Sequence, residues 1–390
     1  MNKKLIALAI AGIAGATFAP AVLAQSANPV TLYGRAWVMV NNIKADGGAA
    51  PLTSRNTVVN ESSLIGVRGT EDLGGGLKGF FQMELGVVVE ENVTSISALS
   101  PAPVLTPTNI NNSPVSGRNS AVGLIGDFGT VLLGRWDTPM KLSQSLADPY
   151  GQNTIGNQVT YVGNGNAGFN RRETNSIQYW SPTINGFTVR AVYAANEGKA
   201  NARAAVLANA TTGAPAVPAA AATNPNNIGG SINYANGPIT INYAFEKHKD
   251  QRVGAIVPDV VEKANNLSAA LVFGPIKLGL LTQKISSTGL TDKKVNSVGV
   301  TYTVGKNEFM ALVARGKNGL VSTVALQPET KMQTVGYNYN FSKRTTFMAR
   351  YAQLKNNAAS SQAMDASGLL NSGGAGGDPK GMGMGLRHTF

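Results

Sequence analysis

The sequence predicts an all-β protein, a sixteen-stranded antiparallel transmembrane β-barrel with short turns at one end and long loops at the other. Three observations lead to this prediction. Apolar and polar residues alternate in many short segments, the connections between them are alternately short and long, and the chain ends on an aromatic residue. A period of two is typical of strands, because successive side chains point to opposite faces. Repeated over many short segments, it indicates a barrel that spans a membrane.

The C-terminal segment shows the alternation most clearly. Met382, Met384, Leu386 and Phe390 share one parity, and small or polar residues occupy the other. A terminal strand with an unpaired edge is an aggregation hazard, so this segment needs a partner. We expect the first strand, near Val30–Asn41, to pair with it and close the ring. Other alternating segments lie at 187–194, 239–246 and 334–341.

The connections set the number of strands. Seven short turns rich in Gly, Pro, Asn, Asp and Ser are expected at 72–76, 126–129, 182–186, 235–238, 274–275, 304–307 and 341–345. Eight longer stretches, expected to be loops, span 43–58, 92–117, 137–171, 197–226, 248–264, 286–293, 317–330 and 356–379. Fifteen connections join sixteen strands, an even number that permits antiparallel closure. Short turns and both chain ends are then periplasmic, and the long loops are extracellular.

The N-terminus carries an export signal. Two lysines precede an apolar run from Leu5 to about Gly15, and small residues follow at Val22–Ala24. This order is typical of a cleaved secretory signal peptide, which we place at residues 1–24. Because no linker interrupts the rest of the chain, residues 25–390 are expected to form a single barrel domain.

Composition narrows the classes of function. Only 14% of the residues are charged and cysteine is absent, so an exported chain of this kind cannot depend on disulfides. The formal net charge of +12 falls to about +10 when the two lysines of the signal peptide are removed. The basic residues are scattered singly along the predicted strands, and the chain is exported. Both facts argue against nucleic acid as a partner and favour a positively charged lumen that attracts anions.

Catalytic and cofactor motifs are weak. Residues Gly163–Gly168 match the pattern of a dinucleotide-binding loop, but no helical pattern follows them. His248 and His388 do not have the spacing of a zinc site. A hydrolase on a barrel is conceivable, because such triads are recognised by geometry, but nothing singles out a serine. We therefore expect no enzyme activity, no cofactor and no metal.

Several ordered blocks identify a family resemblance. They are Val30–Gly34, Gly66–Lys78, Phe81–Glu84, Val122–Arg135, Asn175–Pro182, Asn185–Phe187, Phe341–Thr345 and Gly385–Phe390. Across nearly the whole mature chain the sequence resembles the Gram-negative general porins of β-proteobacteria. The resemblance implies a homotrimer in the cell outer membrane that passes small ions and hydrophilic solutes. It also implies contact with outer-membrane lipid and lipopolysaccharide, and a barrel-assembly machinery that reads Phe390 as its signal.

The resemblance also implies a pore constriction. In such porins the third long loop, here about 137–171, folds into the lumen, and arginines on the wall face it. Arg118 and Arg172 correspond to wall arginines, Glu84 to an acid of the wall and Asp148 to an acid of the loop. Alternation supports Glu84, which shares its face with Gln82, and places Arg172 on the face of Thr174, Ser176 and Gln178.

One position departs from the family pattern. Many relatives carry an arginine two residues before the glycine that corresponds to Gly66, whereas this chain has Leu64. Leu64 shares the parity of Arg68 and should face the lumen. Losing one arginine predicts only a moderate preference for anions. Two alternatives would change this prediction: the third loop could shield Leu64, or Arg68 or Arg55 could supply the missing charge.

The function expected from these observations is passive diffusion of ions and small hydrophilic solutes through a water-filled channel. An alternative is a substrate-specific channel on the same fold, which would need a binding track such as an aromatic ladder. Trp180 shares the parity of Gln178, but one tryptophan near a turn is not a ladder. A third alternative is a structural or adhesive barrel whose loops carry the function.

Overall fold

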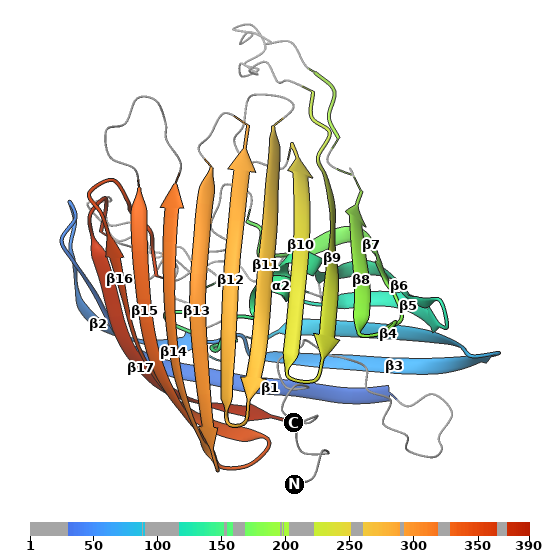
Figure 1. Ribbon diagram of the computed structural model, residues 1–390, viewed down its shortest axis with the longest axis horizontal. Helices are drawn as coiled ribbons and strands as arrows, with labels where there is room; N and C mark the ends of the chain where they lie inside the picture. The colour runs from blue at the N-terminus through green and yellow to red at the C-terminus, as the bar shows by residue number, and fades with distance from the viewer. Residues whose placement is uncertain are drawn as a thin grey trace, which may run out of the picture.

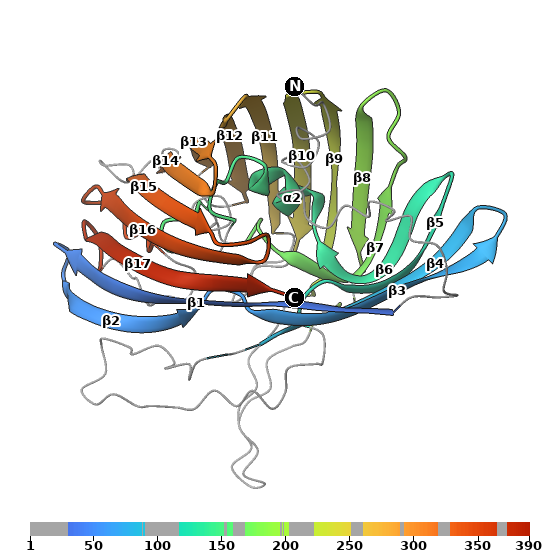
Figure 2. The ribbon, with the colours of Figure 1, turned by 90° about the horizontal axis from the view of Figure 1, so that it is seen from below.

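The computed structural model describes residues 30–87, 89, 117–151, 154–158, 168–195, 197, 199–202, 222–250, 260–288, 292–318, 328–364 and 373–390. Within these ranges, seventeen strands form one sheet that curves into a ring (Figure 1, Figure 2). The strands are β1 (Val30–Asp46), β2 (Leu52–Asn60), β3 (Leu64–Gly74), β4 (Leu77–Gly86), β5 (Ser120–Gly126), β6 (Gly129–Asp137), β7 (Arg172–Trp180), β8 (Phe187–Ala194), β9 (Asn226–Asn236), β10 (Ile239–Lys249), β11 (Val261–Phe273), β12 (Ile276–Ser287), β13 (Lys293–Val304), β14 (Asn307–Asn318), β15 (Glu329–Asn340), β16 (Thr345–Asn356) and β17 (Asp378–Thr389). The predicted signal peptide, residues 1–24, lies outside the described residues.

The seventeen strands make sixteen crossings, because β2 and β3 are two halves of one. β2 pairs with residues Val38–Ala45 of β1, and β3 pairs with residues Val30–Arg35 of the same strand. The break between them, at Glu61–Ser63, contains Ser62 with a positive φ of 83°, an uncommon conformation for a residue other than glycine. The predicted sixteen-stranded antiparallel barrel is therefore confirmed.

The ring closes where the sequence predicts. β1 and β17 pair antiparallel, with Arg35 opposite Thr389 and Asp46 opposite Asp378 at the two ends of the ladder. Beyond the last pair, the amide of Phe390 donates to the Gly34 carbonyl at 3.0 Å, and the Gly34 amide donates to the Phe390 carbonyl at 3.1 Å. Neither terminal strand of the barrel leaves a free edge, which removes the aggregation hazard of an open sheet.

The predicted connections hold, with one correction. All seven short turns join the strands that were expected, from Gly74–Leu77 to Asn340–Thr345. The first long loop is shorter than residues 43–58, because β1 continues to Asp46 and β2 begins at Leu52. Residues 43–46 were expected in this loop, but the stretch keeps the alternation of a strand and pairs with both of its neighbours.

The two faces of the barrel follow the predicted alternation. On β10, Ile241, Tyr243 and Phe245 point outward with 42–44% of their surface exposed, while Ala244 and Glu246 are buried inside. On β17 the outward set is Met382, Met384 and Leu386, as the C-terminal pattern predicted. An outward apolar face is what a barrel presents to lipid.

Helix α2 (Pro139–Ser145) lies in the loop after β6 and packs inside the ring against β8–β11 (Figure 2). The Thr138 hydroxyl accepts from the amide of Lys141 at 3.2 Å and caps the helix, and proline occupies its first turn. No helix in the described ranges is long and apolar enough to cross a membrane. The third loop thus begins with a short helix inside the barrel.

Candidate channel constriction

The third loop is fastened to the inner wall by polar side chains. Asn266 on β11 donates from Nδ2 to the Ser143 hydroxyl at 2.7 Å, and Gln144 donates from Nε2 to Oε1 of Gln283 on β12 at 2.7 Å. These four side chains are at most 1% exposed. Buried polar groups stay buried at little cost only when they are hydrogen-bonded, so the helix and the wall satisfy each other.

Two glycines allow the loop backbone to lie flat on the wall. Gly279 on β12 and Gly299 on β13 are opposite each other in the sheet. A Cβ added at Gly279 would lie 2.7 Å from the carbonyl oxygen of Ala147, and one added at Gly299 would lie 2.9 Å from the same atom. Any larger side chain would lift the loop from the wall, so here glycine is required for close approach.

Beyond the helix, Tyr150 and Asp148 hold the next turn of the loop. The Tyr150 hydroxyl donates to the carbonyl of Thr334 on β15 at 3.1 Å, and its ring lies 5.1 Å from the Arg350 guanidinium. Burial raises the pKa of the Tyr150 phenol well above its usual range, which keeps it a donor. Asp148 is 1% exposed, and its Oδ1 accepts from the Tyr150 amide at 2.8 Å. Asp148 therefore anchors the loop and does not line the free surface of the opening.

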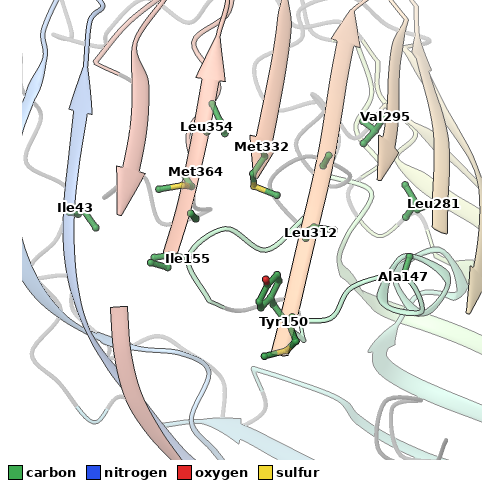
Figure 3. Packing of buried hydrophobic residues seen from close by; sticks show 13 residues of the cluster. Ile43, Ala147, Tyr150, Ile155, Leu281, Val295, Leu312, Met332, Leu354 and Met364 are labelled. Atoms are coloured by element: carbon green, nitrogen blue, oxygen red, sulfur yellow. The ribbon is translucent and has the colours of Figure 1, made fainter. Parts of the chain in front are cut away.

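An apolar cluster completes this attachment. Figure 3 shows Tyr150 and Ile155 of the loop beside inward side chains of the wall, among them Leu312, Met332 and Leu354. These residues are at most 3% exposed. Inward positions of a water-filled barrel are usually polar. Here they are apolar because the loop, rather than water, covers them.

The end of the loop stacks on a buried histidine. The Phe169 ring lies 4.4 Å from that of His248 on β10, with an interplanar angle of 15°. His248 Nε2 is 2.5 Å from Glu246 Oε1, and both side chains are fully buried. From the sequence, His248 was considered only as a possible zinc ligand. Its parity with Glu246 was the available signal that both face inward.

The opposite wall carries arginines. The Arg118 guanidinium donates from Nε to Glu84 Oε1 at 2.5 Å and from a terminal nitrogen to the Ser62 hydroxyl at 2.9 Å. Glu84 also accepts from the Tyr33 hydroxyl at 3.2 Å. The structure thus brings two predicted residues, Arg118 and Glu84, into direct contact. A charge-assisted pair of this kind is short and geometrically well defined.

Arg172 joins the same group by a route that the alternation did not predict. Its Nε lies 3.0 Å from Asn119 Oδ1 and 3.3 Å from Asp137 Oδ1. The register shifts between β6 and β7, where Asn175 has a positive φ of 52°. Because of this bulge, Glu173, which is 5% exposed, shares the buried inward face with Ser176 and Gln178. The parity argument for Arg172 is therefore wrong, although its guanidinium still reaches the cluster.

Asp137 and Lys141 were missed by sequence reasoning. Lys141 on α2 places its Nζ 2.8 Å from Asp137 Oδ1, in the i, i+4 relation typical of helical ion pairs. Burial lowers the pKa of the Lys141 ammonium, while the Asp137 carboxylate opposes this effect. Asn119 further donates to Asp137 Oδ2 at 2.9 Å. The helix thus adds a positive charge to the part of the inner wall that carries Arg118 and Arg172, which we call the arginine wall.

Arg35 is the second residue that sequence reasoning missed. It is directly opposite Leu64 in the β1–β3 ladder, and Leu64 is 7% exposed on the inner face. Arg35 Nε donates to the Ser62 carbonyl at 2.9 Å, and its guanidinium lies 5.4 Å from the Trp37 ring. Within the described ranges no carboxylate forms an ion pair with Arg35. Its parity with Tyr33 and Trp37 on the first strand was the signal that could have found it.

Arg68 stands beside this group, with its guanidinium 5.0 Å from the Tyr33 ring. The cluster as a whole is positive. Arg35 interacts electrostatically with Arg118 and Arg172, and Arg172 and Lys141 interact with each other. Two carboxylates, Glu84 and Asp137, form ion pairs with members of this group, which leaves two of its four positive charges in surplus. Glu173 is neutralised separately by Arg171. Among the described residues, no group of three or more His, Cys, Asp or Glu side chains is arranged to hold a metal ion.

A closed barrel with a lipid-facing exterior, an inserted loop and a charged inner wall defines a membrane channel. The chain matches the family model described as Gram-negative porin over residues 7–359. It is 30% identical to the outer membrane porin protein 32 of Delftia acidovorans over 399 aligned positions, with both chains covered fully. It is 24% identical to the major outer membrane protein P.IB of Neisseria meningitidis over the full length of both chains.

Solved structures agree. The anion-selective porin from Comamonas acidovorans aligns with 93% of this chain and 100% of its own length, at 27% identity and a TM-score of 0.69. OmpT of Vibrio cholerae has the same fold at 15% identity and a TM-score of 0.63. The chain belongs to the Gram-negative porin family. It is an outer-membrane porin that forms a passive channel.

Proposed function

We propose that the third loop and the arginine wall form the constriction of this porin, and that the constriction gives a moderate preference for anions. The surplus of positive charge on Arg35, Arg118, Arg172 and Lys141 is the observation that supports this function. Charges that line a narrow passage decide which ions cross it, because they act across a short, poorly screened distance. The solved relative whose name includes "anion-selective" supports the same sign of preference.

Arg35 supplies the charge that the Leu64 position lacks. The two residues are cross-strand neighbours on the inner face, so their side chains occupy adjacent parts of the wall. The contact of Arg35 with the Ser62 carbonyl holds it beside Arg118, which contacts the Ser62 hydroxyl. Arg35, rather than Arg68 or Arg55, is therefore the compensating residue in this proposal.

Zero-current potentials in a potassium chloride gradient test the proposal. Planar bilayers containing the wild-type protein are expected to show a moderate chloride preference. A preference for potassium would contradict it. Arg68→Gln serves as a control, because Arg68 stacks on Tyr33 at the edge of the cluster.

The substrate-specific alternative is less well supported. An inward aromatic cluster exists on β4–β7, where the rings of Trp136 and Trp180 lie 5.8 Å apart. Phe80 and Trp136 are only 5% and 3% exposed, and Trp180 is the one aromatic member with a partly accessible surface. A binding track needs rings that a solute can reach. Conductance block that saturates with a single sugar or organic acid would revive this alternative.

The partners are also part of the proposal. A related structure, OmpT of Vibrio cholerae, is described in a trimer form, and we propose a homotrimer for this chain. Contact with lipopolysaccharide and with the barrel-assembly machinery is proposed as well. Phe390, which is 49% exposed at the turn end, is the residue that we propose this machinery reads. Cross-linking of the folded protein in membranes tests the assembly. A trimer band is expected, and its absence would contradict the proposal.

A further inference from the structure

A row of cations lies on the outside of the barrel at its loop end. It runs across seven consecutive strands, β10–β16, which stand side by side in Figure 1. All of its members point outward and are exposed: Lys247, Lys263, Lys284, Lys294, Arg315, Lys317, Lys331 and Lys355. We call these residues the cation row. No step in the proposed transport uses them, because they face away from the lumen.

The register of the sheet sets these cations against one another. Lys247 is directly opposite Lys263, Lys284 is opposite Lys294, and Lys331 is opposite Lys355. Arg315 is opposite Lys331, and Lys294 is opposite Lys317. Like charges directly opposite on one face of a sheet destabilise it. Five such pairs in neighbouring positions call for an anion that lies between them.

The protein supplies only part of that negative charge. Asp292 lies 2.8 Å from Lys284, and Glu329 lies 2.8 Å from Arg315 and 3.8 Å from Lys331. Within the part of the chain that the structure describes, no ion pair is made by Lys247, Lys263, Lys294 or Lys355. Lys317 likewise forms no ion pair among the described residues, so five exposed ammonium groups of the row remain for an external anion.

The surroundings of the cation row place that anion at the membrane surface. Next to the cations, toward the middle of the barrel, comes an outward row of amides and a hydroxyl: Asn265, Thr282, Asn296, Gln333 and Gln353. Beyond these lies the apolar band, in which Leu267, Val298 and Val335 are 46–55% exposed. Apolar, neutral polar and cationic rows in this order match the acyl chains, sugars and phosphates of a phosphorylated glycolipid.

The arrangement is confined to one end of these strands, and on one side it stops at β10. At the turn end of the same strands the outward residues are aromatic, including Phe273, Tyr302 and Phe309. At the loop end of β9, Ile228 occupies the position opposite Lys247, and Tyr193 on β8 is opposite Ile228. A general attraction to membranes does not explain why only the loop end carries the cation row. A lipid that is found in only one leaflet does explain it.

We propose that the cation row binds the phosphate groups of a phosphorylated glycolipid in the leaflet that surrounds the loop end. The amide row binds the sugar hydroxyls, and the apolar band contacts the acyl chains. Neighbouring strands are about 4.8 Å apart, so seven strands present a strip roughly 30 Å wide that spans more than one phosphate. This site deepens the proposed contact with lipopolysaccharide and does not depend on ion selectivity.

Native mass spectrometry of the full-length mature protein in detergent tests the site, with bisphosphorylated lipid A as the probe and dephosphorylated lipid A as the comparison. The wild-type protein should bind the phosphorylated form more tightly. Lys247→Gln combined with Lys263→Gln removes one opposed pair and should weaken that binding about twenty-five-fold, at about fivefold for each lysine. Lys306→Gln combined with Lys343→Gln, which changes two exposed lysines at the turn end, is the matched control and should bind as the wild type does.

Three results would overturn the proposal. They are equal affinity of wild type and the Lys247/Lys263 variant, equal binding of the two lipid A forms, and full displacement of the lipid by inorganic phosphate. The last result would assign the row to small anions. The comparison of lipid forms uses only the wild-type protein, so it decides the question even if the variant fails to fold. Unchanged single-channel conductance of the variant separates this test from that of the proposed constriction.

Discussion

The two inner walls of this barrel follow the same alternation but carry different residues. The wall formed by β1–β7 holds the arginine cluster, whose guanidinium groups are fixed by Glu84, Ser62 and Asp137. The wall formed by β10–β16 presents mainly glycines, small polar residues and buried apolar side chains, with a few buried charged groups such as Glu246 and Arg350, and the third loop packs against it. One wall supplies the charge of the constriction and the other supplies the attachment of the loop.

The difference teaches how one chain can set pore size and pore charge separately. The position of the loop depends on contacts such as Gly299 with Ala147, which carry no charge. The sign of the field depends on cations such as Arg35, which lie on the far wall. Changes on the attachment wall are therefore expected to alter conductance, and changes on the arginine wall to alter selectivity.

The largest effect is expected from filling the glycine site. Gly299→Leu would place a side chain where the Ala147 carbonyl and Pro149 now lie at 2.9 Å. Overpacking of this kind costs about 1–3 kcal/mol. The loop is expected to move toward the arginine wall, so single-channel conductance and the melting temperature should both fall. Gly79→Leu is the control, since a Cβ there meets only Leu73 at 3.8 Å. Unchanged conductance in Gly299→Leu would show that the loop is not held by this contact.

The next largest effect is expected from Arg35→Gln. This arginine makes no ion pair among the described residues, so its charge acts fully on the passage. Removing a unit charge near a narrow opening changes the barrier for a monovalent ion by about 1 kcal/mol. Zero-current potentials should shift toward potassium by a correspondingly large amount. The same shift in Arg68→Gln would contradict the special position of Arg35.

Glu84→Gln should act in the opposite direction and more weakly. The substitution removes a negative charge that now pairs with Arg118 at 2.5 Å, so the preference for chloride should rise. Loss of the partner also frees Arg118 to move, which reduces the gain. Arg118→Gln should lower the preference for chloride in the same measurement. If both variants shifted the potential in the same direction, the field of the wall would not be the cause.

The outline of the fold could be predicted from sequence, because alternation and turn chemistry are local properties. They placed the seven turns, the closing pair of strands and the outward set on β17. They failed where backbone geometry breaks the period, at the bulge beside Asn175 that moves Glu173 to the inner face. No local rule signals such a bulge, since it depends on the register with the next strand.

The charge cluster was only partly predictable. Arg118, Arg172 and Glu84 followed from the family resemblance, and the structure brings them together. Arg35 was missed, although its parity on the first strand was readable. Asp148 was expected in the opening but is buried, with its carboxylate bonded to the amide of Tyr150. The Tyr150 hydroxyl in turn binds the wall at Thr334, a tertiary contact between residues far apart in the chain.

The smallest effect is expected from restoring the missing arginine by Leu64→Arg. The new guanidinium would lie directly opposite Arg35 on the inner face, where Leu64 is 7% exposed. Like charges at directly opposite positions repel, so the new side chain should turn away and add little to the field. The preference for chloride should rise by less than Arg35→Gln lowers it. Leu64→Met, which keeps the volume without charge, should leave the potential unchanged. A rise as large as the fall in Arg35→Gln would mean that Arg35 does not compensate for Leu64.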